Sequence, residues 1–415
     1  MRELTESRPL LSIVADDLAG AADTAAQVAT PERPALVSLG PRPSRLPKDA
    51  ARVSAWAIDA DCRHAEVDEC AVRVHDASAQ LNRIPRGISY LKLDSTLRGN
   101  VGTALEAAQD LEGRQGVVLA PAFPERGRTV VGGVLLVGGK PVAETEIATD
   151  GAAPVTISEV AGIVRRQWDC RSAVFDPRDF DSPQGLAASL TQAIYDGFEL
   201  LVMDSESAKD LRMIAAAVND GTLRHEWSGV LPAGSAGLAR GFAEVMGVRR
   251  STPPPPPAAT PLPVLVLVGS RTRVASEQIE SLTRAGVQCL DADAPGAVQC
   301  AAAILNAEAA VAITPGGDTH ESTAAVAAGV LSQCGRARLV LSGGATARCF
   351  CELARIRHMW IVGELQPGVA AGRAIATEGE AMPLVIKGGA AGNATVMVEA
   401  IRWLRGASAG QGELM

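Results

Sequence analysis

The sequence has few aromatic residues, few histidines and no paired cysteines, and each scarcity excludes a class of protein. Aromatic residues make up 3% of the chain, so its cores must rely on Ala, Val, Leu and Ile. The eight cysteines are scattered and none forms a Cys-x-x-Cys pair, which argues against a disulfide scaffold. Cys62, His64, Cys70 and His75 fit no zinc-ligand spacing, and no motif typical of a nucleophilic triad surrounds any of the five histidines. We therefore expect no structural metal and no triad.

An excess of positive charge and long apolar runs are also missing. The formal net charge is −8, so we expect no basic surface of the kind that neutralises nucleic-acid phosphates. No apolar run reaches membrane-spanning length, and the first residues, Met1 to Glu6, are charged, unlike the apolar core of a signal peptide. We expect a cytoplasmic protein with neither nucleic acid nor a membrane as a partner.

Two common nucleotide-binding motifs do not occur. The chain contains no Gly-x-x-x-x-Gly-Lys-Ser/Thr phosphate-binding loop and no Gly-x-Gly-x-x-Gly fingerprint with a downstream acid. The sequence therefore argues against a P-loop fold and against an NAD enzyme.

What the chain does contain is an alternation of short apolar runs and helical segments, the pattern of parallel α/β domains. Strands are expected near residues 10–15, 35–39, 53–58, 88–93 and 117–120, and later near 264–268, 287–290, 309–313, 338–341 and 384–386. Helices are expected near residues 19–29, 66–82 and 103–111, and later near 274–285, 297–305, 322–331, 346–353 and 395–404. Between these groups, Val134 to Val142 predicts a β-hairpin turned by Gly138-Gly139, as a flap or an oligomer contact.

Five consecutive prolines, Pro253 to Pro257, interrupt the alternation. Such a run forms a stiff polyproline spacer that continues neither a helix nor a central strand. The sequence thus predicts an α/β fold of two domains, each a mainly parallel sheet flanked by helices, joined by a Pro-rich linker. The expected boundaries are 1–250 for the first domain, 251–263 for the linker and 264–415 for the second domain.

The stretch from Ile13 to Thr24 joins an apolar strand to a helix through two acids, Asp16 and Asp17, and a glycine, Gly20. Open α/β sheets bind ligands where a strand gives way to a helix in this manner. Because side chains alternate along an extended strand, one acid should face the crevice while the other caps the helix or orients a neighbour. The alternative is that both acids merely cap a turn.

A second strand-to-helix stretch, Leu91 to Gly102, is equally rich in polar residues. Lys92 and Asp94 alternate on one strand face, so they can pair, either at a functional site or as a structural ion pair. Arg98 and Arg128 can clamp a carboxylate or phosphate through bidentate hydrogen bonds. The alternative for Arg128, as for its neighbour Arg126, is a solvated loop.

Residue pairs that contain glycine follow several apolar runs in the C-terminal part: Gly269-Ser270, Gly316-Gly317, Gly343-Gly344 and Gly388-Gly389. A glycine turn before a helix presents backbone N–H groups and the positive end of the helix dipole to phosphate. One such pair is weak evidence, whereas several at corresponding strand ends predict a nucleotide crevice.

Three motifs in this order resemble those of the four-carbon acid-sugar kinase family, whose members phosphorylate tetronates and related acid sugars with ATP. They are Asp-Asp-x-x-Gly-Ala-x-Asp-Thr at Asp16 to Thr24, Lys-x-Asp-Ser-Thr-x-Arg-Gly-Asn at Lys92 to Asn100, and Ala-Pro-Ala-Phe-Pro at Ala120 to Pro124. The likeness continues through Glu144 to Glu146, Pro154-Val155 and Gly234 to Ala239, and more loosely to the C-terminus, so it covers nearly the whole chain.

The resemblance implies an ATP-dependent kinase acting on a hydroxyl of a threonate, erythronate or oxo-tetronate, with Mg2+ bridging the ATP phosphates. The first domain would hold the acid sugar and the second ATP, and closure about Pro253 to Pro263 would bring them together. The candidate acids are Asp17, Asp16 and Asp94, and no residue is expected to bind the metal directly. The candidate substrate-binding residues are Lys92, Ser95, Arg98, Gly99 and Arg128. The candidate nucleotide-binding residues are Ser270, Gly343, Gly344, Ala345, Thr346, Gly388 and Gly389.

The sequence departs from the family pattern in two of its glycine turns. Ala345 stands where the family usually has Asp, and Lys387-Gly-Gly-Ala-Ala-Gly392 replaces the usual Lys-Ser-Gly-Asn-Phe-Gly. Gly-Gly-Asp-Thr does occur at Gly316 to Thr319, but after an earlier strand. We therefore expect this stretch to be a look-alike, which matches the family motif in sequence but not in position. The alternatives are a kinase for another acid sugar and a non-catalytic sugar-acid sensor that retains the fold. The sequence also leaves open whether the protein forms a homodimer.

Overall fold

The computed structural model describes residues 9–40, 52–83, 87–219, 229–249, 253–258, 262–307, 310–316, 320–376 and 381–406. The chain forms two compact units. Unit 1 comprises Met1–Val28 and Gly40–Arg249, and unit 2 comprises Ala29–Leu39 and Arg250–Met415. The division near residue 250 lies beside the proline run, but Ala29–Leu39 belongs with the C-terminal part, which the sequence did not predict. The chain therefore passes between the units at three places, not through the proline segment alone.

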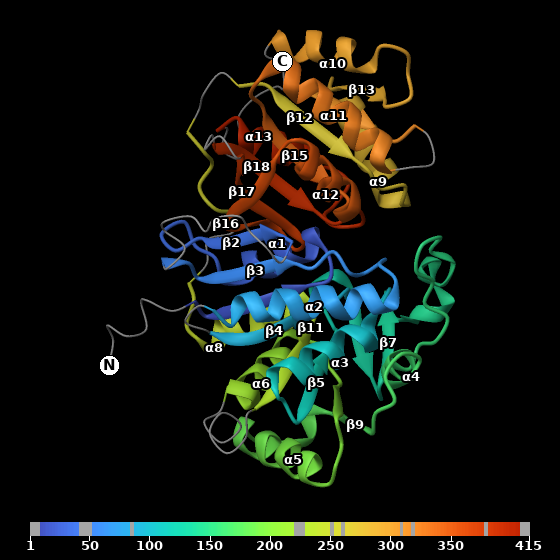
Figure 1. Ribbon diagram of the computed structural model, residues 1–415, viewed down its shortest axis with the longest axis vertical. Helices are drawn as coiled ribbons and strands as arrows, with labels where there is room; N and C mark the ends of the chain where they lie inside the picture. The colour runs from blue at the N-terminus through green and yellow to red at the C-terminus, as the bar shows by residue number, and fades with distance from the viewer. Residues whose placement is uncertain are drawn as a thin grey trace. The chain divides into compact units, whose positions relative to one another are not determined.

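Unit 1 is built on a parallel sheet with the strand order β3-β1-β4-β11-β5-β10-β9 (Figure 1). The strands are β1 Leu11–Ala15, β3 Ala55–Asp59, β4 Ile88–Lys92, β5 Gly116–Ala120, β9 Ser172–Phe175, β10 Leu200–Met203 and β11 Val230–Gly234. Most are buried throughout, as expected of strands covered on both faces. After β1 the chain adds β3 on one side and β4 on the other, so the topology switches at β1 and predicts a ligand crevice at its carboxyl end.

The helices of unit 1 contact one another in two rows that flank the sheet (Figure 1). One row comprises α1 Leu18–Val28, α8 Ala236–Val245, α6 Ala208–Asn219 and α5 Pro183–Tyr195. The other comprises α2 Val67–Leu81, α3 Val101–Glu112 and α4 Val160–Arg165. Every residue of α1 is buried, because its many alanines let neighbouring backbones approach closely. The helix that follows Asp16 and Asp17 is thus held rigidly.

The expected hairpin forms part of a separate antiparallel sheet, composed of β6 Arg128–Val131, β7 Val134–Val137 and β8 Lys140–Pro141. Gly138 and Gly139 turn it as predicted, and both have positive φ, which L side chains rarely adopt. Asp204, after β10, accepts the N–H groups of Gly132 and Gly133 at 2.5 and 2.8 Å and so ties this sheet to the main one. Short 3-10 helices complete unit 1: η2 Pro124–Arg126, η3 Val142–Glu144, η4 Glu146–Thr149 and η5 Pro177–Asp179.

Unit 2 contains strands in the order β13-β14-β12-β15-β18-β17-β16-β2. They are β13 Gln288–Asp291, β14 Ala310–Thr314, β12 Val264–Val268, β15 Arg338–Ser342, β18 Ala381–Lys387, β17 Val369–Ala376, β16 Ile356–Gln366 and β2 Ala35–Leu39. The first five are parallel and the rest antiparallel. Strands β16 and β17 were not predicted, and β2 was expected in the first sheet. Pairing between strands that are distant in the sequence leaves no local pattern from which it could be predicted.

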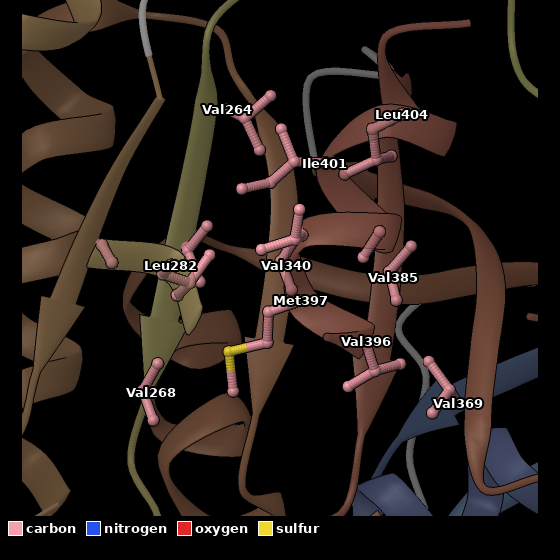
Figure 2. Close-up of a cluster of buried hydrophobic side chains, with 14 of the residues drawn as sticks. Val264, Val268, Leu282, Val340, Val369, Val385, Val396, Met397, Ile401 and Leu404 are labelled. Atoms are coloured by element: carbon pink, nitrogen blue, oxygen red, sulfur yellow. The ribbon is translucent and has the colours of Figure 1, made fainter. Parts of the chain in front are cut away.

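Aliphatic side chains fill the core of unit 2, as the scarcity of aromatics predicts. Strands β12, β15, β17 and β18 pack there against α9 Arg273–Arg284 and α13 Val396–Leu404 (Figure 2). The labelled members are Val264, Val268, Leu282, Val340, Val369, Val385, Val396, Met397, Ile401 and Leu404. Burying one such side chain contributes about 1.5–3 kcal/mol. A further row of helices comprises α10 Ala297–Asn306, α11 His320–Cys334 and α12 Gly344–Leu353.

The proline run lies against unit 2 in its described part, residues 253–258, and is not a free spacer there. Pro254 is buried, and its carbonyl accepts the indole N–H of Trp403 at 2.9 Å. Residues 251–252 and 259–261 of the predicted linker lie outside the described residues. Across the described chain, no helix is both long enough and apolar enough to span a membrane.

Candidate functional site

The loops that follow β1, β3 and β4 meet at the carboxyl ends of these neighbouring strands in unit 1. The loop after β1 carries Asp16 and Asp17, the loop after β3 carries Arg63, and the loop after β4 carries Asp94. The backbone N–H of Asp94 donates to Asp16 Oδ2 at 3.2 Å, which joins two of the loops directly. The acids that the sequence singled out are therefore brought together.

Both acids after β1 bind the same guanidinium, that of Arg63. Its Nε and Nη2 donate to Asp16 at 2.7 and 2.9 Å, and its Nη1 and Nη2 donate to Asp17 at 3.0 and 2.7 Å. The prediction that Asp16 and Asp17 face different ways is wrong, because β1 ends at Ala15 and strand alternation stops there. Asp17 Oδ1 also accepts the N–H of Gly20 at 2.8 Å, so this acid does orient the start of α1.

A second ion-pair cluster surrounds Asp94. Nε and Nη2 of Arg98 donate to the two oxygens of Asp94 at 2.8 and 3.2 Å, and its Nη1 donates to Asp150 at 3.0 Å. The hydroxyl of Thr96 also donates to Asp94. The guanidinium of Arg98 thus links the end of β4 to the loop around Asp150. The expected clamp of Arg98 on an anionic substrate stays a prediction.

Lys92 does not pair with Asp94, contrary to the pairing that their spacing suggested. The strand ends at Lys92, so the alternation that would align the two side chains is lost. Lys92 is 5% exposed, and its ammonium donates to the carbonyl of Leu93 at 2.7 Å. A Cβ on Gly20 would lie 2.8 Å from Lys92 Nζ and 2.5 Å from Asp17 Oδ1, which places the ammonium beside Asp17. Among the described residues, no carboxylate lies within ion-pair distance of Lys92.

Arg128, the first residue of β6, is the second cation of the site without a carboxylate partner among the described residues. Its Nη1 donates to the carbonyl of Arg126, and its buried Nε has no hydrogen-bond partner. Burial, followed by repulsion from Arg126, lowers the pKa of Arg128 to about 10. The solvated-loop alternative does not hold for this side chain, because it is partly buried and its Nε is shielded from solvent.

Ser95, Gly99 and Asn100 belong to the same motif but serve different local needs. Ser95 is buried in the turn after β4. Gly99 has φ +85°, and a Cβ on it would lie 2.2 Å from the carbonyl oxygen of Arg63, so only glycine fits. The side-chain amide of Asn100 donates to the carbonyls of Cys62 and Ala65 at 3.0 and 2.7 Å. Gly99 and Asn100 therefore hold the loop that carries Arg63.

The pKa shifts of the acids follow from this arrangement of charges. Burial would raise the pKa of Asp17, but Arg63 and then Lys92 lower it below its usual value. Burial would likewise raise the pKa of Asp94, but Arg98 and Arg63 hold it well below its usual range. Both carboxylates are therefore ionised near neutral pH. Asp17 is the most exposed of the three acids, at 17% against 13% for Asp94 and 5% for Asp16.

In unit 2, three glycine turns come together after the adjacent parallel strands β12, β15 and β18. Gly269 N–H donates to the Ser342 carbonyl at 2.8 Å, and Gly343 N–H donates to the Lys387 carbonyl at 3.0 Å, so strand pairing extends into the turns. A Cβ on Gly389 would lie 2.2 Å from Ser270 Oγ, so the first and last turns touch. The predicted nucleotide-binding residues of these turns are thus neighbours.

The turn after β15 leads straight into α12. Gly343 is the residue before the helix and has φ +102°, and Ala347 N–H makes the first helical bond to its carbonyl. The amides of Gly344, Ala345 and Thr346 precede that bond, so they have no partner within the helix. The side chain of Ala345 is exposed, whereas Thr346 is buried, with its Oγ1 1.8 Å from where a Cβ on Gly269 would lie. Thr346 does not cap α12, because Gly343 is the N-cap and no side chain caps the helix.

A buried lysine, Lys387, links two of these turns through hydrogen bonds. Lys387 is 1% exposed, and its ammonium donates to Ser342 Oγ at 2.9 Å and to the Gly389 carbonyl at 3.0 Å. Of the look-alike sequence Gly316 to Thr319, only Gly316 lies among the described residues, after β14. In the described part of the chain, no three His, Cys, Asp or Glu side chains gather as a metal-binding group.

Arg63 was not among the site residues predicted from the sequence. The available signal was position: Cys62-Arg63-His64 follows a strand, as Asp16-Asp17 and Asp94 do. In a parallel sheet, polar residues that follow adjacent strands meet at one edge. The adjacency of β3 to β1 was not visible in the sequence.

Two family models match the chain: a sugar-binding N-terminal domain over residues 11–242 and a nucleotide-binding C-terminal domain over residues 301–397. The chain is 32% identical to a D-threonate kinase of Salmonella typhimurium, over 68% of this chain and 63% of that protein. It is 29% identical to a D-threonate kinase of Bordetella bronchiseptica, over 96% of this chain and 98% of that protein. It is 25% identical to a 3-oxo-tetronate kinase of Burkholderia multivorans, over 97% and 99% of the two chains.

Solved structures share the fold. A crystal structure from Salmonella typhimurium LT2 matches with a TM-score of 0.77 and 21% identity, covering 94% of this chain and 98% of that one. A Haemophilus influenzae protein matches with a TM-score of 0.72 and 22% identity, covering 95% and 100%. At these identities the likeness concerns the fold alone.

Proposed function

Because this chain belongs to the four-carbon acid-sugar kinase family, with its sugar-binding N-terminal and nucleotide-binding C-terminal domains, we propose that it phosphorylates a hydroxyl of a threonate, erythronate or oxo-tetronate with ATP. The observation that carries this proposal is the pair of cations Lys92 and Arg128. Neither has a carboxylate partner among the described residues, and both lie near ionised acids of the same site. An anionic substrate supplies the missing negative charge.

Each residue of the unit 1 site has a role in this reaction. Arg128 and Lys92 bind the carboxylate of the acid sugar through charge-assisted hydrogen bonds. Asp17, the most exposed acid, orients the reacting hydroxyl and accepts its proton. The hydroxyl oxygen forms a bond to the γ-phosphorus, the bond from that phosphorus to the β,γ-bridging oxygen breaks, and ADP leaves. A depressed pKa at Asp17 suits this chemistry, because the transition state of phosphoryl transfer is loose and demands little proton abstraction early on.

The turns of unit 2 fit the phosphates of ATP, which supplies the phosphoryl group when it is bound. The glycine turns after β12, β15 and β18 lack side chains that would cover their backbone N–H groups. The first turn of α12 adds amides that have no partner within the helix. Such a cradle does not depend on the side chain at position 345, so Ala345 does not favour the sensor alternative. Mg2+ would neutralise charge on the ATP phosphates when bound, and we assign no residue of the chain as its direct ligand. We further propose a cytoplasmic location.

The test is a turnover assay with the purified chain, ATP and Mg2+ on a panel of D-threonate, D-erythronate and 3-oxo-tetronate. We expect ADP and a phosphorylated acid sugar from at least one of them. Lys92→Met should abolish use of that substrate while ATP affinity stays unchanged, and Lys140→Met, on the exposed hairpin of the same unit, serves as the matched control. Tight binding of an acid sugar with no turnover on any of the panel would instead support the sensor.

A further inference from the structure

The loop 62–65, which follows β3, places Arg63 at the centre of the unit 1 site. Arg63 is 10% exposed, and each of its three guanidinium nitrogens donates to a carboxylate of Asp16 or Asp17. No nitrogen of this guanidinium is left over as the principal contact of a substrate. Arg63 therefore differs from Lys92 and Arg128, neither of which makes an ion pair with a carboxylate among the described residues.

The backbone holds this loop from two sides. The N–H groups of Cys62 and Arg63 donate to the carbonyl of Asp16 at 3.0 and 3.2 Å. From the other side, Asn100 binds the carbonyls of Cys62 and Ala65, and Gly99 packs against the carbonyl of Arg63. A loop anchored through five backbone groups presents its side chain in one place, which is what a residue that orients others requires.

The guanidinium of Arg63 also offsets the repulsion between the carboxylates of Asp16 and Asp17. Two adjacent carboxylates at a buried strand end repel each other and would share a proton without a cation between them. Burial alone would lower the pKa of Arg63, but Asp16, Asp17 and Asp94 raise it well above its usual range. The same attraction lowers the pKa of Asp17. The geometry and the charges thus describe one unit of three side chains.

We propose that Arg63 is a positioning residue of the phosphoryl transfer: its guanidinium fixes the orientation of Asp16 and Asp17 and does not itself bind the acid sugar. The inference rests on the proposed function, in which Asp17 accepts the proton of the reacting hydroxyl. It also gives Gly99 and Asn100 a role, as the supports of the loop that carries Arg63, and not as substrate ligands.

The test compares Arg63→Gln and Arg63→Lys with Arg178→Gln, a surface arginine of the same unit that also bridges two acids, Asp176 and Glu206. We expect kcat of Arg63→Gln to fall about a hundredfold, in the range of lost acid–base catalysis, with KM for the acid sugar changed by less than about threefold. Arg63→Lys keeps the charge but not the bidentate geometry, so it should retain an intermediate kcat. Arg178→Gln should match the wild type.

The pH profile separates positioning from a merely structural role. Removing the cation raises the pKa of the Asp17 carboxyl, so Asp17 becomes protonated and inactive at a higher pH. The acid limb of kcat/KM in Arg63→Gln should therefore move up by about one pH unit or more. Arg63→Lys should leave that limb near its wild-type position. The other groups that face the two acids, which all variants retain, are Lys92, Asp94, His64 and Cys62.

Several outcomes would overturn the inference. An unmoved acid limb in Arg63→Gln, a loss expressed mainly in KM, or a wild-type kcat in Arg63→Lys would each do so. Should Arg63→Gln not fold, which thermal unfolding reveals, the kcat of Arg63→Lys decides. If the wild type phosphorylates no acid sugar, the proposed function fails. A carbon-13 titration of the aspartate carboxyls then still tests the positioning: a higher pKa of Asp17 in a folded Arg63 variant supports it, and an unchanged value refutes it.

Discussion

The candidate sites of the two units are built from opposite materials. In unit 1 the site consists of charged side chains: three acids, two arginines that pair with them and two further cations. In unit 2 it consists of backbone: three glycine turns, a helix N-terminus and a buried lysine that joins two of the turns. Both lie at the carboxyl ends of adjacent parallel strands, so the architecture is shared and the chemistry is not.

The difference follows from what each site would recognise. A phosphate chain is bound well by N–H groups and a helix dipole, which any sequence with suitable glycines can supply. An acid sugar needs its carboxylate held and one hydroxyl addressed, which requires particular side chains in particular places. Unit 1 should therefore be sensitive to loss of a functional group, and unit 2 to the addition of bulk. Four substitutions test this contrast.

The largest effect is expected from Asp17→Asn, which keeps the shape of the side chain and removes its charge. Turnover should fall by about a hundredfold or more, because the proton acceptor is lost, while ATP affinity measured by calorimetry stays unchanged. Asp181→Asn, an exposed acid of the same unit, is the control. Wild-type turnover in Asp17→Asn would exclude this residue and pass the assignment to Asp16 or Asp94.

Arg128→Gln should act on binding. We expect KM for the acid sugar to rise by about ten- to a hundredfold, since a charge-assisted hydrogen bond is worth about 1.5–3 kcal/mol, with little change in kcat. The free energy of unfolding should change little, because Arg128 loses only its hydrogen bond to the Arg126 carbonyl, while its buried Nε has no hydrogen-bond partner. Steady-state kinetics and denaturant unfolding, with Arg165→Gln on the surface as the control, measure both quantities. A change in kcat alone would contradict the assignment.

Adjacent glycines in unit 2 make a matched pair. A Cβ on Gly389 would lie 2.2 Å from Ser270 Oγ and 2.6 Å from Ser270 Cβ, so Gly389→Ala must displace the neighbouring turn. We expect ATP affinity to fall about tenfold. A Cβ on Gly388 would meet no protein atom within 4 Å, so Gly388→Ala should leave thermal unfolding unchanged, and any loss of ATP affinity there reports contact with the nucleotide. Acid-sugar affinity should be unchanged in both, and equal ATP affinity in wild type and Gly389→Ala would contradict the cradle.

The smallest effect is expected from Ala345→Asp, which restores the residue usual in the family. Because position 345 is exposed and the turn offers backbone donors regardless of the side chain, ATP affinity should stay unchanged or tighten by less than about tenfold. Calorimetry with ATP and Mg2+ on the wild type, Ala345→Asp and the uncharged Ala345→Asn makes the comparison. No detectable nucleotide binding by the wild type would contradict both the cradle and the kinase proposal.

The sequence located the two sites but misassigned several of the partnerships within them. As predicted, Asp17, Asp94 and the glycine turns lie where a strand ends and the chain leads into a helix. Lys92 and Asp94 were expected to pair because strand alternation was extended past the end of β4. Where a strand stops, the direction of each side chain depends on turn geometry, which local periodicity does not encode.

By itself, the sequence determined the elements and the chemistry they carry: apolar runs long enough for buried parallel strands, small residues that let α1 pack tightly, and glycines at the strand ends. These are local properties of a few neighbouring residues, so periodicity and composition reveal them. Only the tertiary structure decided which elements lie side by side. It brought β3 beside β1, and with it Arg63 to Asp16 and Asp17, and it carried β2 away to pair with β16 in unit 2. Such contacts join residues tens to hundreds of positions apart, and their free energy depends on the packing of the whole unit.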